Sequence, residues 1–241
     1  MGTHYPGVPH DLVAWLRDAA GLTAFVETGT HKGTTAAWAA GLFPRVVTTE
    51  AYEPLYRLSL ARHGHLPNVE FRLGDSPAVL REVVPTLTGP AVFWLDAHWS
   101  GPGTAGGAEA SPGPAAGPVP DARARPGGEP GSGAATEEGS GSAAGECPLL
   151  AELAAVNAAA ADAGHVVLID DARLFLAPPP APHDPTHWPD LRAVCDALGR
   201  HPSDRYVLVF RDVIVAVPSR LRSELIAYVR AAVEMATESV G

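Results

Sequence analysis

Short apolar stretches rich in β-branched residues alternate along this chain with longer stretches whose apolar residues recur at helical spacing. The strands that this alternation predicts are residues 23–28, 45–50, 69–73, 91–96 and 166–170. The predicted helices are residues 9–20, 34–42, 54–64, 77–87, 149–156 and 190–198. Strands that alternate with helices form a mainly parallel sheet with helices on both faces. The sequence therefore predicts an α/β fold.

The end of the chain departs from this alternation. Residues 206–210 and 213–217 predict two further strands, joined at Arg211-Asp212 in a tight hairpin, and a last helix is predicted for residues 219–235. A C-terminal antiparallel hairpin adds one antiparallel strand to the sheet. The expected sheet has seven strands in all.

An acidic residue stands at or just beyond the carboxyl end of each strand predicted to run parallel. These acids are Glu27, Glu50, Asp75, Asp96 and the pair Asp170-Asp171. Ligands of open parallel sheets bind beyond the carboxyl ends of the strands. One such acid is common, but a series over five successive strands predicts a binding site lined by carboxylates.

The first predicted strand passes into its helix through a turn that contains Gly29 and Gly33. Gly29 allows the backbone to turn, and Gly33 allows the start of the helix to pack closely. Glu27 stands where the dinucleotide fingerprint Gly-x-Gly-x-x-Gly has its first glycine, and its carboxylate would repel a pyrophosphate. The turn therefore favours a cofactor with an ammonium group and no phosphate, such as S-adenosylmethionine.

At these positions the chain resembles the class I S-adenosylmethionine-dependent methyltransferases, over nearly its whole length apart from residues 101–146. The resemblance rests on Glu27-x-Gly29-x-x-x-Gly33, on Glu50 and on Gly74-Asp75. It implies a Rossmann-like α/β fold and methyl transfer from S-adenosylmethionine.

The same resemblance implies a role for each matching residue. The methionine part of the cofactor would lie over Glu27, Thr28 and Gly29, with Gly33 counted in the same turn. Glu50 would bind both ribose hydroxyls. The adenine amino group would meet Asp75, with Ser76 nearby.

A narrower resemblance is to the metal-dependent O-methyltransferases that act on sugars of macrolide and aminocoumarin antibiotics. Those enzymes carry Leu-Asp after the fourth strand and Asp-Asp after the fifth, which Leu95-Asp96 and Asp170-Asp171 match. This chain departs from them in Ala97-His98-Trp99 and in the long segment before the Asp pair. The resemblance implies O-methylation of a small hydroxylated, secondary-metabolite-like substrate and a Mg²⁺ ion at Asp96, Asp170 and Asp171.

The chemistry of methylating a hydroxyl gives these residues distinct tasks. A hard divalent cation held by carboxylates lowers the pKa of a hydroxyl. His98 follows Asp96 by two positions and could take the hydroxyl proton, because its ordinary pKa is near neutral. Asp96 and His98 are therefore the expected catalytic residues. Five other side chains are candidate substrate contacts, namely Trp99, Arg173, His183, His187 and Trp188. Arg173 is the candidate for meeting an acidic substrate, whereas Trp94 is expected in the core.

Composition limits the class of partner. The formal net charge is -10, so the chain lacks the basic face that nucleic acids require. Its start shows no secretion-signal pattern, and its apolar runs are too short to cross a membrane. We therefore expect a cytoplasmic protein with a small-molecule substrate and no membrane or nucleic-acid partner, and a homo-oligomer is compatible with the sequence.

Residues 101–146 differ in kind from the rest of the chain. They contain no Leu, Ile, Met, Phe, Tyr or Trp, so they cannot bury enough apolar surface to offset the entropy of ordering. We expect one methyltransferase domain over residues 1–241, with a disordered insertion at residues 101–146.

Three alternatives remain open on sequence alone. The first is metal-independent methylation of a nitrogen or carboxylate, in which the acids serve only as hydrogen-bond partners. The second is a nicotinamide-dependent oxidoreductase, which Glu27 and the lack of a clear hydride site disfavour. The third is a binding protein that keeps the cofactor fold without catalysis.

Overall fold

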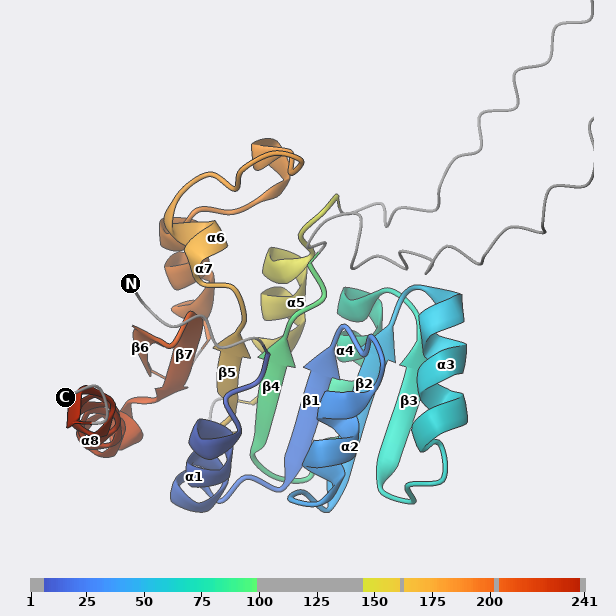
Figure 1. The fold of residues 1–241 in the computed structure, drawn as a ribbon, viewed down its shortest axis with the longest axis horizontal. Coiled ribbons are helices and arrows are strands. Elements are labelled where there is room, and N and C mark those ends of the chain that lie inside the picture. Colours follow the sequence, from blue (N-terminus) through green and yellow to red (C-terminus); the bar gives the residue numbers. More distant parts are fainter. Residues whose placement is uncertain (1–6, 99–144, 161–162, 202–203, 239–241) are drawn as a thin grey trace, which may run out of the picture.

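The structure is a computed structural model that describes residues 7–98, 145–160, 163–201 and 204–238. Its strands form one seven-stranded sheet in the order β3-β2-β1-β4-β5-β7-β6 (Figure 1). The strands are β1 (Ala24–Thr28), β2 (Arg45–Glu50), β3 (Val69–Leu73), β4 (Ala91–Leu95), β5 (Val166–Ile169), β6 (Arg205–Phe210) and β7 (Val213–Pro218). Only β7 runs against the others, pairing antiparallel with β5 and β6. The predicted Rossmann-like sheet is confirmed.

Helices cover both faces of this sheet. They are α1 (His10–Ala20), α2 (Thr34–Ala40), α3 (Glu53–His63), α4 (Ser76–Val83), α5 (Leu149–Val156), α6 (Arg173–Leu176), α7 (Leu191–Leu198) and α8 (Arg222–Glu238). The described residues also contain the 3₁₀ turns η1 (Val84–Thr86), η2 (Pro185–His187) and η3 (Ser219–Leu221). None of the helices in the described ranges is long and apolar enough to cross a membrane.

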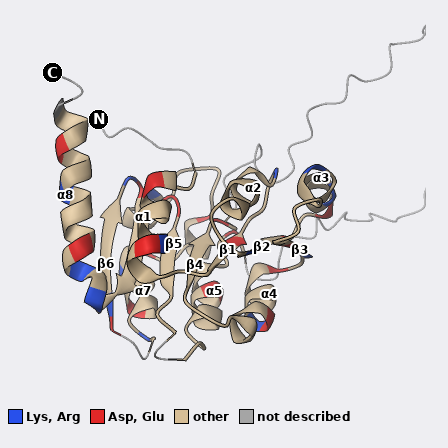
Figure 2. Cartoon of the chain, turned by 90° about the horizontal axis from the view of Figure 1, so that it is seen from below, with Lys and Arg blue, Asp and Glu red and all other residues tan. Residues whose placement is uncertain are grey.

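The core has two halves, one on each face of the sheet. Successive strand residues point to opposite faces, so Phe25 and Trp94 pack with α1 and α2, whereas Val26 and Phe93 pack with α4 and α5. Figure 2 shows the two layers, with α1 and α2 on one side of the sheet and α4, α5 and α7 on the other. Strands β1 and β4 are buried along their whole length, as is typical of parallel strands covered by helices on both faces.

The structure differs from the sequence prediction at several element ends. The helix predicted for residues 77–87 changes to a 3₁₀ turn at Val84, where Pro85 lacks the N–H that an α-helix would need. The last helix is likewise preceded by the 3₁₀ turn at Ser219–Leu221. Helix α6 was not predicted. Residues 101–144 of the predicted insertion lie outside the described residues, and so does Trp99.

Candidate functional site

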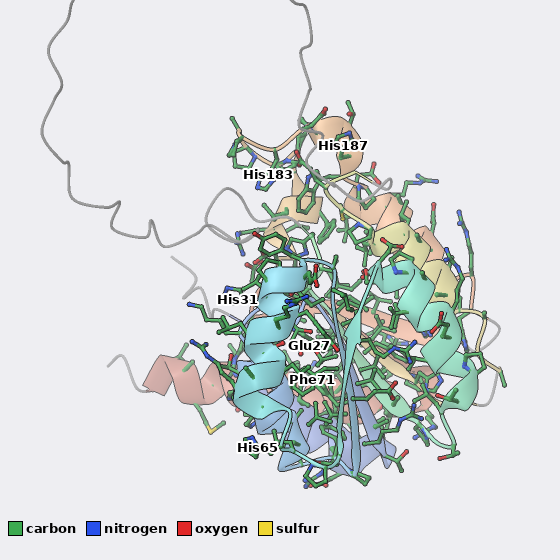
Figure 3. The ribbon with its side chains drawn as sticks, turned by 90° about the vertical axis from the view of Figure 1, so that its right-hand side faces the viewer. Glu27, His31, His65, Phe71, His183 and His187 are labelled. Carbon is green, nitrogen blue, oxygen red and sulfur yellow. The ribbon has the colours of Figure 1, made fainter. Side chains whose placement is uncertain are left out.

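The carboxyl ends of the parallel strands meet along one edge of the sheet, at the top in Figure 1. Thr28 of β1 pairs with Thr49 of β2 on one side and with Leu95 of β4 on the other, and Leu95 pairs with Ile169 of β5. The predicted acids therefore lie at or just beyond neighbouring strand ends. The loop of residues 177–189, with His183 and His187, stands above this edge (Figure 3).

The glycine turn lies against the main chain that follows β4. Gly29 has a φ of 85°, and a Cβ at Gly29 would lie 2.5 Å from the backbone oxygen of Asp96. No side chain fits between the two segments. Gly33 has a φ of 76°, and a Cβ there would lie 2.8 Å from Cδ2 of His63. Gly33 therefore allows the start of α2 to pack closely on α3, as predicted.

Glu50 is held at both carboxylate oxygens by backbone groups. The N–H of His31 donates to Oε2 at 2.9 Å, and the N–H of Tyr52 donates to Oε1 at 3.0 Å. These contacts fix the carboxylate between the glycine turn and the loop before α3. Each carboxylate oxygen has a second lone pair, so Glu50 can still accept hydrogen bonds from a pair of hydroxyls.

Glu27 is only 2% exposed and lies inside the fold, with the more exposed His31 beyond it (Figure 3). The Thr48 hydroxyl donates to Oε2 of Glu27 at 2.6 Å, and the same hydroxyl is 2.6 Å from Oγ1 of Thr30. Burial raises the pKa of Glu27 to about 8, although hydrogen bonds from Thr48 and Thr35 lower it. The expected ligand-facing carboxylate is therefore a buried and largely protonated group at neutral pH.

A buried acid that the sequence prediction missed lies beside the predicted adenine site. Glu152 of α5 is 1% exposed and accepts a hydrogen bond from the Ser76 hydroxyl at 2.5 Å. Burial raises its pKa, although hydrogen bonds from Ser76 and Thr28 lower it. Glu152 falls three positions after Leu149 and four before Val156, so it shares the buried helix face. That spacing was the signal that could have revealed it.

Asp96 and Asp170 follow paired residues of β4 and β5. The N–H of Asp170 donates to the carbonyl of Leu95 at 3.2 Å. Burial, followed by the charges of Asp170 and Asp171, raises the pKa of Asp96 well above its usual range, and burial with the charge of Asp171 raises that of Asp170 to about 6. Both shifts indicate carboxylates that a cation would stabilise.

Asp171, the third predicted metal ligand, is engaged elsewhere. Its Oδ2 lies 3.0 Å from Nε2 of His98, and its Oδ1 accepts from Nη1 of Arg173 at 2.6 Å. Within the described ranges, no group of three or more His, Cys, Asp or Glu side chains is placed to hold a metal ion. The predicted ligand set Asp96, Asp170 and Asp171 is therefore not assembled as one cluster.

His98 is buried beside these acids, and its Nε2 is also 3.8 Å from Oδ1 of Asp96. Burial would raise the pKa of Asp171, but the hydrogen bond and charge of His98, together with Arg173, hold that pKa below its usual value. Asp171 is thus ionised and accepts from His98 Nε2–H. The structure brings the predicted base together with a carboxylate partner that was not predicted for it.

Arg173 does not present a free charge to an acidic substrate. Its Nη1 contacts Asp171 and also pairs with Oδ2 of Asp212. Each contact offsets part of the guanidinium charge. The suggestion that Arg173 meets an acidic substrate is therefore not supported by its surroundings.

The loop of residues 177–189 is tied down by Glu146. The Trp188 indole donates to Oε2 of Glu146 at 2.9 Å, Nδ1 of His183 lies 3.4 Å from the same oxygen, and the N–H of Asp184 donates to Oε1 at 3.1 Å. The Trp188 ring lies edge-on to His98, with ring centroids 5.3 Å apart. The loop therefore reaches the candidate base. Glu146, which was included in the predicted disordered insertion, is an ordered anchor, and Trp94 lies in the core as predicted.

No protein-family description and no curated protein sequence matches this chain. Solved structures do match its fold. An O-methyltransferase from Bacillus cereus, in complex with S-adenosylhomocysteine, is 16% identical with a TM-score of 0.52 over 90% of this chain and 83% of its own. The O-methyltransferase TomG from Streptomyces achromogenes, in complex with S-adenosylmethionine, is 14% identical with a TM-score of 0.51 over 89% of this chain and 82% of its own. At such identities the likeness shows a shared fold.

Proposed function

We propose that this protein is an S-adenosylmethionine-dependent methyltransferase that methylates a hydroxyl of a small, secondary-metabolite-like molecule. The Rossmann-like methyltransferase fold and the acids along its carboxyl edge support this proposal. No nucleic acid or membrane is proposed as a partner.

The observation that carries the proposal is the environment of Glu50. Two backbone N–H groups, from His31 and Tyr52, hold its carboxylate at the end of β2. A carboxylate fixed in this way keeps acceptor sites for two neighbouring hydroxyls, such as those of a ribose. The glycine turn at Gly29 follows β1 and the pair Asp75-Ser76 follows β3, the two strands on either side of β2, so we propose that the methionine and adenine ends of the cofactor lie on either side of Glu50.

S-adenosylmethionine, when bound, supplies a methyl group activated on a sulfonium. A base would have to take the proton of the acceptor hydroxyl as its oxygen receives the methyl group and the sulfonium becomes a neutral thioether. Since His98 donates its Nε2–H to Asp171, the basic atom of the ring is Nδ1. Ionised Asp171 stabilises the protonated ring that results.

Asp96 and Asp170 fit part of a magnesium site. Mg²⁺ commonly takes one or two protein carboxylates and fills its other positions with water or substrate oxygens. Burial raises the pKa of both acids and the charges of neighbouring aspartates raise it further, a repulsion that a cation would relieve. When bound, Mg²⁺ would orient and acidify the acceptor hydroxyl. Asp171 is left out of the proposed ligand set, because it pairs with His98 and Arg173 and forms no metal-binding group with the other two acids in the described residues.

Cofactor binding is tested by calorimetric titration with S-adenosylhomocysteine. We expect E50Q to weaken binding by about tenfold or more, because a neutral amide forms weaker hydrogen bonds to hydroxyls than a charged carboxylate does. E53Q is the matched control, since Glu53 lies nearby at the start of α3 and pairs with Arg57 on the surface. Equal affinities in wild type and E50Q would count against the cofactor assignment.

The metal is tested with Mn²⁺ as a paramagnetic probe of the Mg²⁺ site. We expect Mn²⁺ to bind the wild type and D196N, whose altered residue is an exposed α7 acid, and to bind D170N at least about tenfold more weakly, because one of its two carboxylates is lost. Absence of Mn²⁺ binding to the wild type would favour metal-independent methylation of a nitrogen or carboxylate. The pairing of Asp171 with His98 and Arg173 is the observation that favours metal-independent methylation as the second candidate function.

A further inference from the structure

The turn between β6 and β7 contacts the segment that carries Asp171. The backbone oxygen of Asp212 accepts the N–H of Ala172 at 2.7 Å, and its Oδ1 accepts the N–H of Arg173 at 2.9 Å. Its Oδ2 pairs with Nη1 of Arg173. One turn residue thus binds two consecutive residues at the start of α6, three contacts in all.

An aspartate is an unusual choice at this point of the turn. Arg211 and Asp212 have φ values of 52° and 64°, and tight hairpin turns of this kind prefer Asn-Gly or Asp-Gly, with glycine second. Asp212 occupies the second position. Both oxygens of its carboxylate contact Arg173, so the side chain serves the neighbouring segment.

That segment holds the carboxylate partner of the candidate base. Asp171 itself has a φ of 54°, which is unfavourable for a residue with a side chain unless its surroundings hold it in place. Arg173 bridges the two aspartates through Nη1. On its other side Asp171 meets His98 at 3.0 Å. A continuous chain of contacts therefore runs from the hairpin turn to the imidazole.

We propose that Asp212 is a positioning residue for the base: through Arg173 and the backbone at 172–173, it holds Asp171 where it fixes the tautomer of His98. This inference rests on the proposed function, in which His98 takes the proton of the acceptor hydroxyl. The β6–β7 hairpin would then help to position the base of a site that otherwise lies at the ends of the parallel strands.

Nitrogen-15 NMR of the full-length protein, labelled on histidine and assigned with H98Q, tests the proposal without cofactor or acceptor. In the wild type we expect His98 to carry its proton on Nε2, protected from exchange by Asp171. D212G removes the carboxylate at a φ that glycine adopts without strain. We expect it, like D171N, to give a tautomer mixture with proton exchange faster by about fivefold, the effect of losing a half-exposed ion pair.

D204N is the matched control, because Asp204 lies just before β6 and binds Ser219 away from the site; it should match the wild type. A D212G spectrum identical to the wild type, with D171N altered, overturns the proposal. Should D212G fail to fold, D212N decides, since asparagine tolerates a positive φ: faster exchange supports the proposal and unchanged exchange overturns it. Failure of the proposed function would appear separately, as absent S-adenosylhomocysteine binding.

Discussion

Glu27 places an acid group beneath the glycine turn, where solvent does not reach it. Its pKa rises from an ordinary 4.5 to about 8, mainly through burial. The folded state therefore binds this proton more tightly than the unfolded state does. The stability that Glu27 contributes is complete below about pH 4.5 and is lost as the pH rises through 8.

We predict that E27Q removes this pH dependence. The free energy of unfolding of the wild type should fall relative to that of E27Q by about 3 kcal/mol between pH 5 and pH 8. Urea unfolding at several pH values measures the difference. E70Q, at an exposed position of β3, should track the wild type. If the free energies of unfolding of the wild type and E27Q differed by a constant amount across this pH range, the raised pKa of Glu27 would be contradicted.

For single residues, the sequence predicts where the acids lie in the fold better than it predicts which side chains they contact. The acids at the strand ends were predictable because a buried parallel strand is a short apolar run with a clear end. The partner of His98 was not predictable, since Asp171 is 73 positions away and reaches it only through a backbone conformation that sequence does not reveal. Glu152 escapes prediction because a charged residue of a helix is expected on its solvent-facing side.

Among the elements, the glycine turn after β1 is the most constrained. A side chain at Gly29 would meet the backbone oxygen of Asp96, and the φ of 85° adds strain. We predict that G29A destabilises the protein by about 2 kcal/mol or more and weakens S-adenosylhomocysteine binding. Chemical unfolding and calorimetry measure these two effects.

Gly41, at the end of α2, provides the control for G29A. Its φ is -76°, and the nearest atom to an added Cβ is 3.4 Å away. G41A should therefore be neutral or stabilise by a few tenths of a kcal/mol. A G29A variant as stable as G41A would show that the turn does not press on Asp96.

Helix α6 shows why some elements escape prediction. It is one turn long, from Arg173 to Leu176, and follows an aspartate with positive φ. So short a helix has no periodicity to read. Its first residues are held by Asp212, which lies 39 positions away. The ordered position of Glu146 likewise escapes prediction, because the composition around it carries no sign of the Trp188 contact.

Across the whole molecule, one aspartate near the start of the chain joins three distant elements. Asp11 of α1 accepts from Nη1 of Arg211 at 2.7 and 2.8 Å and from the Tyr228 hydroxyl of α8 at 3.0 Å. Burial would raise the pKa of Asp11, but the bonds from Arg211 and Tyr228 lower it overall. This stabilisation is present above about pH 4 and is lost as the pH falls below it.

We predict that D11N lowers the free energy of unfolding at pH 7 by about 1 kcal/mol, a value discounted because the Asp11 side chain is 53% exposed. The deficit should shrink at pH 3. D18N alters an exposed acid of the same helix, bonded to its neighbour Arg17, and should leave stability within about 0.5 kcal/mol of the wild type. If D11N and D18N lowered the free energy of unfolding equally, the contacts of Asp11 with Arg211 and Tyr228 would not stabilise the fold.

The close backbone packing of Gly29 against Asp96 also limits where mutations could give this protein new substrates. Insertions or bulky replacements around residues 96–97 would displace the glycine turn, which we propose binds the cofactor. Residues 177–189 lie on a separate loop, anchored at Glu146. Laboratory evolution toward a new acceptor should therefore accumulate its successful changes there.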